Sequence, residues 1–297
     1  MKKLLLAAAL FSTSLLPSIS HADYTNLGKI SVESIAKKYP TLNQSLEMAI
    51  VGVPASLLKS NQPFYGYYKD LKNVDFIDDV TAPTIVYMHG SGNAFDHSGD
   101  VPKLKWDYNY AYWLVEAGYV FIAPDAHRID DRPTFSSPVP KELYEEVHAI
   151  RQAEITQAAT ALTQKTFVNK AEMYLLGVSE GAFSAARYAG SEFKGRMVLS
   201  WSCEPGYFTD YPKVGANKKS PFLNIMGFRD VYFGKDAPYN TNYSKNSGTC
   251  ANHLSLAGFT NARVITYPET GHGVTYNQYM KGDLLQFLNH WIGKDVK

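Results

Sequence analysis

Short apolar runs alternate with stretches of helical spacing from about residue 46 onward, and this alternation restricts the possible folds more than any other feature. Several of the runs are continuously apolar, which is typical of strands that are covered on both faces of a sheet. Strands that alternate with helices predict an α/β fold, with a mainly parallel sheet of about eight strands and helices on both faces. The expected strands are Glu47–Val51, Phe64–Tyr68, Thr84–Met88, Tyr119–Ala123, Met173–Leu176, Arg196–Trp201, Phe222–Met226 and Val264–Tyr267.

Two segments have the spacing of amphipathic helices. Leu143, Val147 and Ile150 are four and three residues apart. Near the C-terminus, the apolar residues between Leu284 and Ile292 recur on one helical face. Sheets of this kind place their functional sites in the loops at the carboxyl ends of the strands, so candidate catalytic residues are sought there.

The length of 297 residues suits one large domain with its own core. We expect a single domain over residues 46–297, preceded by a polar N-terminal extension over residues 23–45. The 29 basic and 28 acidic side chains nearly cancel, which argues against a nucleic-acid partner.

The first 22 residues have the pattern of a secretory signal peptide. Lys2 and Lys3 are followed by an unbroken apolar run from Leu4 to Phe11, and the apolar character continues to Leu16. Ser20-His21-Ala22 provides small residues at the expected cleavage site. The alternative, a membrane anchor, needs about 20 apolar residues. We therefore expect an exported protein, periplasmic or secreted, without stable membrane insertion.

Cys203 and Cys250 are the only two cysteines. An oxidising compartment favours a disulfide between them, which would close a loop of about 48 residues and stabilise the fold by roughly 4 kcal/mol in the chain-entropy model. The alternative is two buried free thiols. Two cysteines without a histidine at ligand spacing make a poor zinc site, and no metal is expected.

A candidate nucleophile follows the apolar run Met173–Leu176. Gly177-Val178-Ser179-Glu180-Gly181 has the pattern G-x-S-x-G between an expected strand and an expected helix. The glycines allow a sharp turn in which backbones approach closely, and the turn would place Ser179 at a helix N-terminus, where N–H groups stabilise anionic charge. The alternative is an ordinary glycine-rich turn.

This arrangement resembles the α/β-hydrolase superfamily, nearest to secreted dienelactone-hydrolase-like proteins, over roughly residues 45–293. The resemblance implies a serine hydrolase with a catalytic triad in the chain order nucleophile, acid, histidine. The namesake enzymes use cysteine as the nucleophile, whereas this chain has Ser179. That departure removes the ground for expecting a dienelactone as the substrate.

The resemblance implies where the base and the acid lie. His272 follows the last expected strand within Glu269-Thr270-Gly271-His272-Gly273, the position of the family's catalytic histidine. Asp230 follows the strand Phe222–Met226, the family's usual place for the acid. Glu204, just past the preceding strand, and Asp236 are the alternatives. The carboxylate would fix the histidine tautomer and stabilise the imidazolium.

The segment His89-Gly90-Ser91-Gly92 resembles the family's oxyanion-loop motif. The backbone N–H of Ser91, or alternatively of Gly90, would stabilise the developing oxyanion together with the N–H of Glu180. His89 is expected to support this loop. The Glu180 side chain would either repel anionic substrates or pair with a neighbouring base.

Three further segments are candidates for lining the substrate site. Arg128 or Arg132 would hold a substrate carboxylate, or else belong to an ion-paired loop. The aromatic stretch Trp106–Trp113 would flank a cleft, or else form a core-facing helix. The polar segment Tyr232–Tyr243 would form a lid or a substrate wall.

The sequence therefore predicts an exported serine hydrolase that cleaves carboxylic-ester bonds of small molecules, with Ser179, His272 and Asp230 as the triad. An enzyme of this kind is expected to need no metal or organic cofactor. The alternatives are a peptidase of the prolyl-oligopeptidase-like branch and a catalytically silent binding protein on the same fold. The oligomeric state stays open.

Overall fold

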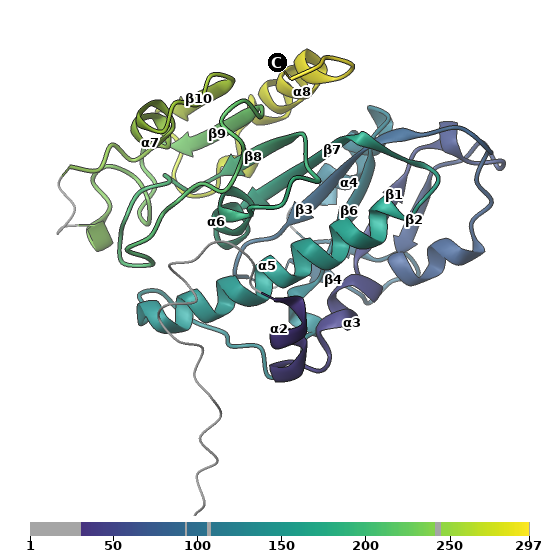
Figure 1. The fold of residues 1–297 in the computed structure, drawn as a ribbon, viewed down its shortest axis with the longest axis horizontal. Helices are drawn as coiled ribbons and strands as arrows, with labels where there is room; N and C mark the ends of the chain where they lie inside the picture. The colour runs from purple at the N-terminus through teal and green to yellow at the C-terminus, as the bar shows by residue number, and fades with distance from the viewer. Residues whose placement is uncertain (1–30, 93, 106–107, 241–244, 297) are drawn as a thin grey trace, which may run out of the picture.

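The computed structural model describes residues 31–92, 94–105, 108–240 and 245–296, so the expected signal peptide lies outside the described residues. An eight-stranded sheet has the order β10-β9-β8-β7-β3-β6-β1-β2 (Figure 1). β1 pairs antiparallel with β2 and β6, and the other neighbours are parallel. These strands are β1 Ile50–Val53, β2 Phe64–Tyr67, β3 Ala82–Met88, β6 Val120–Ala123, β7 Val168–Val178, β8 Gly195–Leu199, β9 Phe222–Gly227 and β10 Ala262–Tyr267.

The eight strands confirm the predicted fold class, and each overlaps one of the eight expected runs. The prediction for the first strand began three residues too early, because Leu42–Glu47 forms the helix α3 and β1 begins only at Ile50. A two-stranded hairpin, formed by β4 (Phe95–Asp96) and β5 (Lys103–Leu104), was not predicted, since two-residue strands leave no periodicity to detect.

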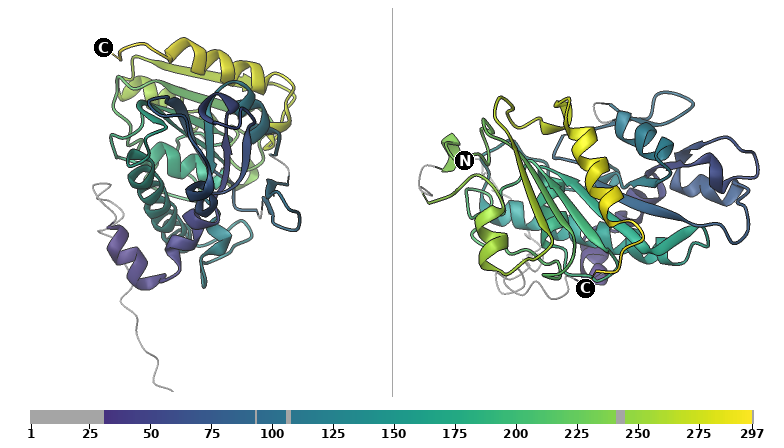
Figure 2. Two further views of the ribbon diagram at one scale, coloured as in Figure 1. Left: turned by 90° about the vertical axis from the view of Figure 1, so that its right-hand side faces the viewer. Right: turned by 90° about the horizontal axis from the view of Figure 1, so that it is seen from above.

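Helices cover both faces of the sheet (Figure 2). On one face, α4 and α8 pack with inward side chains such as Ile85 and Tyr87 of β3. On the other face, α5 packs with the alternate side chains, Val86 and Met88. This two-sided coverage explains why the strand is apolar without alternation. The helices are α2 Val32–Lys38, α3 Leu42–Glu47, α4 Tyr108–Glu116, α5 Lys141–Thr163, α6 Glu180–Arg187, α7 Ala251–Leu256 and α8 Met280–Trp291.

Residues 31–45, expected as part of a polar extension, include α2 and the start of α3, and both helices pack on α5. Ile35 and Leu42 are buried against Ile150 and neighbouring residues of α5. The Ser45 hydroxyl donates to Glu154 of α5, in the interior. These two helices therefore complete the outer surface of the layer that carries α5.

Short 3-10 helices connect several of these elements: η1 Ala55–Leu57, η2 Tyr68–Asn73, η3 Ala126–Arg128, η4 Pro238–Asn240 and η5 Val274–Tyr276. In the described part of the chain, no helix combines the length and the apolar character that crossing a membrane requires.

Candidate active site

Ser179 occupies a strained turn between β7 and α6. Its φ is 54° and its ψ is −116°, a conformation that non-glycine residues rarely adopt. The flanking glycines are needed for a steric reason. A Cβ on Gly177 would lie 2.2 Å from the carbonyl oxygen of Gly181, and a Cβ on Gly181 would lie 2.0 Å from that of Met88. Close backbone contacts, one within the turn and one with the end of β3, thus explain the G-x-S-x-G spacing.

His272 and Asp230 lie next to Ser179 in a continuous hydrogen-bonded series. His272 Nε2 is 2.8 Å from Ser179 Oγ, and His272 Nδ1 is 2.8 Å from Asp230 Oδ2. A carboxylate only accepts, so Nδ1 carries the proton and Nε2 is free to accept the hydroxyl proton of Ser179. The structure therefore brings together the three residues that the sequence predicted as a triad.

Backbone groups fix the orientation of the Asp230 carboxylate. Its Oδ1 accepts from the N–H groups of Tyr232 and Phe233 at 2.8 and 3.0 Å, and its side chain is fully buried. The loops after β9 and β10 lie side by side, since the N–H of Arg229 donates to the carbonyl of Thr270 at 3.0 Å. This pairing places Asp230 beside the histidine loop.

The two alternative acids lie elsewhere. Glu204 accepts from the N–H and Oγ of Ser247 and from the N–H of Gly248 at 2.6–2.9 Å, which ties the loop after β8 to residues 247–248. Burial raises the pKa of its carboxyl. Asp236 is exposed to solvent.

His89 supports the segment from which the first oxyanion donor is expected. Its buried ring accepts at Nε2 from the N–H of Ala126 at 3.2 Å, and its Nδ1 lies 2.6 Å from the carbonyl oxygen of Gly90. Burial and the nearby Arg151 cation hold the pKa of His89 well below its ordinary value. The imidazole is therefore neutral, with its proton on Nδ1 donated to Gly90.

A cavity of about 340 Å³ opens beside the triad. A Cβ on Gly90 would lie 3.5 Å from the Cβ of Ser179. The segment His89-Gly90-Ser91-Gly92, from which the first oxyanion donor is expected, therefore borders the nucleophile directly. The Tyr232 ring stands edge-on against the His272 ring, with centroids 4.7 Å apart. The cavity is lined by Ser91, Phe135, Ser136, Ser137, Tyr144, Ser179, Glu180, Phe208, Tyr232, Phe233 and His272.

Two alternatives that the sequence left open are decided by ion pairs. Glu180 Oε1 lies 2.5 Å from Arg132 Nη2, and both side chains are almost completely buried. Arg128 Nε lies 3.3 Å from Asp125. Glu180 thus pairs with a neighbouring base, and both arginines belong to an ion-paired loop.

The aromatic stretch Trp106–Trp113 mostly faces the core where the structure describes it. Tyr110 and Trp113 are buried in the cluster under α4, whereas residues 106–107 lie outside the described residues. In the expected lid or wall, Tyr232 lines the cavity, and residues 241–243 again fall outside the described ranges.

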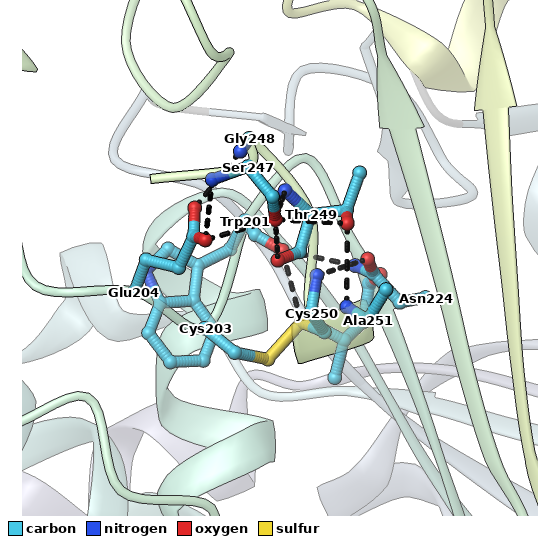
Figure 3. The surroundings of a disulfide bond; sticks show 10 residues. Trp201, Cys203, Glu204, Asn224, Ser247, Gly248, Thr249, Cys250 and Ala251 are labelled. Atoms are coloured by element: carbon cyan, nitrogen blue, oxygen red, sulfur yellow. Dashed lines mark hydrogen bonds between the residues drawn. A yellow bond between two sulfur atoms is a disulfide. The ribbon is translucent and has the colours of Figure 1, made fainter. Parts of the chain in front are cut away.

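The sulfur atoms of Cys203 and Cys250 lie at bonding distance (Figure 3). Cys203 lies in the loop after β8, and Cys250 directly precedes α7, so the pair connects these two segments. Asn224 supports both sides, since its Oδ1 accepts from the N–H of Cys250 and its Nδ2 donates to the carbonyl of Trp201. No cluster of potential metal-ligating side chains occurs among the described residues.

Sequence reasoning missed the buried Arg151 and the cavity-lining aromatic residues Phe135 and Phe208, whereas Phe233 belongs to the segment expected as a lid or wall. Arg151 lies four residues after Val147 on the buried side of α5, and a charged residue at such a position was the available signal. The aromatic residues lie in loops, where no periodicity marks a side chain as pointing toward the site.

Comparisons with known proteins identify the fold. No family profile and no curated protein matches the chain. The structure is similar to that of a protein from Klebsiella pneumoniae subsp. pneumoniae assigned as a dienelactone hydrolase, with 15% identity, a TM-score of 0.51, and 82% of this chain and 98% of that chain covered. Acetyl xylan esterase 1 from Thermoanaerobacterium sp. has 14% identity and a TM-score of 0.45, with 73% and 77% covered. The chain has the α/β-hydrolase fold, and at this identity the likeness establishes the fold alone.

Proposed function

We propose that the protein is a serine hydrolase that cleaves neutral carboxylic esters through an acyl-enzyme. The observation that carries the proposal is the hydrogen-bonded series from Asp230 through His272 to Ser179, built on a strained strand-to-helix turn. A nucleophile, a base and a group that orients the base, each within hydrogen-bond reach of the next, are the requirements for activating a serine hydroxyl.

In the proposed acylation step, Ser179 Oγ forms a bond to the ester carbonyl carbon while His272 Nε2 takes the hydroxyl proton. The carbonyl oxygen becomes an oxyanion, which the N–H groups of Ser91 and Glu180 stabilise. Glu180 is the first residue of α6, where helix N–H groups lack intrahelical acceptors and remain available. The tetrahedral intermediate then collapses, and the leaving alcohol departs with the proton from His272.

In deacylation, His272 removes a proton from water, and the resulting nucleophile attacks the acyl carbon. The second intermediate expels Ser179 Oγ, which regains its proton from His272, and the carboxylic acid leaves. Through both steps the buried carboxylate of Asp230 orients His272 and stabilises the imidazolium.

The lining of the cavity supports a neutral, compact substrate. Of the described residues that line it, none is lysine or arginine, and the carboxylate of Glu180 is already paired with Arg132. A substrate carboxylate would therefore lose its hydration without gaining a cation, which is costly. The rings of Phe135, Phe208 and Phe233 instead provide apolar walls that suit an aliphatic or aromatic acyl group.

Export is also part of the proposal. The signal-peptide pattern of residues 1–22 supports it, and so does the position of Cys203 and Cys250 at bonding distance, since disulfides persist in oxidising compartments. We propose that the mature protein begins after Ala22 and carries this disulfide.

Intact-mass spectrometry after treatment with a fluorophosphonate tests the proposal. One adduct on the wild type that is absent from Ser179→Ala would support an activated serine, and a deficit of about 2 daltons before reduction would report the disulfide. Hydrolysis of p-nitrophenyl acetate but not of aminoacyl-amide substrates would distinguish an esterase from a peptidase. A folded wild type that forms no adduct would refute the hydrolase and favour a silent binding protein.

A further inference from the structure

One buried side chain contacts both backbone segments from which the oxyanion donors are expected. Arg151 lies within α5 and is completely buried. Its Nη2 donates to the carbonyl oxygen of His89 at 3.0 Å, and its Nη1 lies 3.1 Å from His89 Nε2. Its Nε lies 3.5 Å from Glu180 Oε1. The guanidinium therefore links the segment that begins at His89 to the residue that follows Ser179.

The contacts at His89 orient two consecutive peptide planes. A trans peptide is planar, so its C=O and N–H point to opposite sides. Arg151 holds the carbonyl of His89, which turns the N–H of Gly90 away from the guanidinium. His89 Nδ1 holds the carbonyl of Gly90 at 2.6 Å, which turns the N–H of Ser91 away from the imidazole. Arg151 thus acts on Gly90 directly and on Ser91 through the ring.

Ion pairs restrain the guanidinium itself. Arg151 Nη1 lies 2.8 Å from Glu154 Oε2, and neither side chain is exposed. Glu180 Oε1 lies between Arg151 and Arg132, which fixes the side chain of the residue whose N–H is the second expected donor. The cluster balances two arginines against two glutamates, so Arg151 has carboxylate partners at both ends.

We propose that Arg151 is a positioning residue that holds the two oxyanion donors at the separation required by the tetrahedral intermediate; this rests on the proposed function. A guanidinium presents five N–H donors in a rigid fork, whereas a lysine ammonium is a compact charge. Arg151→Lys keeps a cation beside Glu154 and Glu180 but cannot reproduce both contacts with His89.

Arg187 provides a matched control. It lies on α6, and its Nη1 is 2.6 Å from Glu145 Oε2 of α5 in an almost fully buried ion pair. Arg187→Lys therefore perturbs a buried arginine–glutamate pair between the same two helices. Its partner is Glu145, which belongs to neither oxyanion segment.

The experiment compares wild type, Arg151→Lys and Arg187→Lys by kcat and KM on p-nitrophenyl acetate and by the rate of fluorophosphonate labelling. We expect Arg151→Lys to lower kcat and the labelling rate by about 10-fold or more, where the loss of one oxyanion donor typically costs roughly 100-fold. KM should change less than about 3-fold. Arg187→Lys should stay within about 3-fold throughout. Unchanged kcat in folded Arg151→Lys, or an equal loss in Arg187→Lys, would overturn the proposal.

Backbone amide NMR separates this proposal from the function on which it rests. The resonances of Gly90, Ser91 and Glu180 should shift in Arg151→Lys and stay in place in Arg187→Lys. If the wild type neither hydrolyses the ester nor reacts with the probe, the proposed function fails, and the amide comparison still decides what Arg151 holds. If Arg151→Lys does not fold, Glu180→Gln removes the other end of the link. Unchanged Gly90 and Ser91 amides in that variant would reject the proposal.

Discussion

Asp230→Asn is expected to abolish nearly all activity by forcing the wrong tautomer of His272. The two backbone N–H groups at Oδ1, from Tyr232 and Phe233, need an acceptor, so the amide oxygen of asparagine must stay there. Its NH₂ group then faces His272 Nδ1 at the position of Oδ2, 2.8 Å away. A donor at that position requires a bare Nδ1, and the imidazole proton moves to Nε2.

With its proton on Nε2, the neutral imidazole donates toward Ser179 and cannot act as its base. We expect kcat to fall about 10⁴-fold, equivalent to about 5.4 kcal/mol of barrier. Asp230→Ala removes the carboxylate without placing a donor at Nδ1, so its loss should be smaller than that of Asp230→Asn. A larger loss of activity in Asp230→Asn than in Asp230→Ala is expected only where backbone donors hold the second oxygen of the carboxylate.

The assay is kcat on p-nitrophenyl acetate for both variants, with ¹⁵N NMR of His272 to locate the ring proton. Glu204→Gln is the control, because Glu204 binds residues 247–248 and not His272. Its kcat should stay within about 2-fold of wild type. Activity of Asp230→Asn within tenfold of wild type, or inactivation by Glu204→Gln, would refute the assignment of the acid.

Three further predictions concern stability and the turn. Replacing Cys203 and Cys250 together by serine should lower the free energy of unfolding by roughly 4 kcal/mol in urea titrations, because the two cysteines lie 47 positions apart in the chain; an unchanged midpoint would exclude the disulfide. Burial holds the pKa of His148 well below 6.5 in the folded state, so only the unfolded chain takes up this proton. Stability should therefore fall by about 1.4 kcal/mol per pH unit below pH 6.5 from this residue, and His148→Leu should lessen the slope of unfolding free energy against pH. Gly181→Ala should abolish fluorophosphonate labelling, since its Cβ would lie 2.0 Å from the backbone oxygen of Met88; wild-type labelling would contradict the steric argument.

The fold class and the nucleophile turn could be predicted from the amino-acid sequence alone. Strands covered on both faces are continuously apolar, so the run Thr84–Met88 identified β3 without knowledge of its neighbours. The turn at Ser179 was detectable because its close contacts exclude a Cβ at fixed positions on either side. Both signals can be detected in short stretches of sequence, although the contact that excludes a Cβ at Gly181 comes from Met88 at the end of β3.

The acid beside His272, the partner of Glu180 and the contacts of Arg151 depend on how distant segments meet in the folded chain. His272 is 42 residues from Asp230 and 93 from Ser179 along the chain, and Arg151 is 62 residues from His89. Asp230 and Glu204 both follow strands of the same sheet, and no local pattern distinguishes them. The choice depends on which loops meet when parallel strands align, and that alignment is a property of the whole sheet.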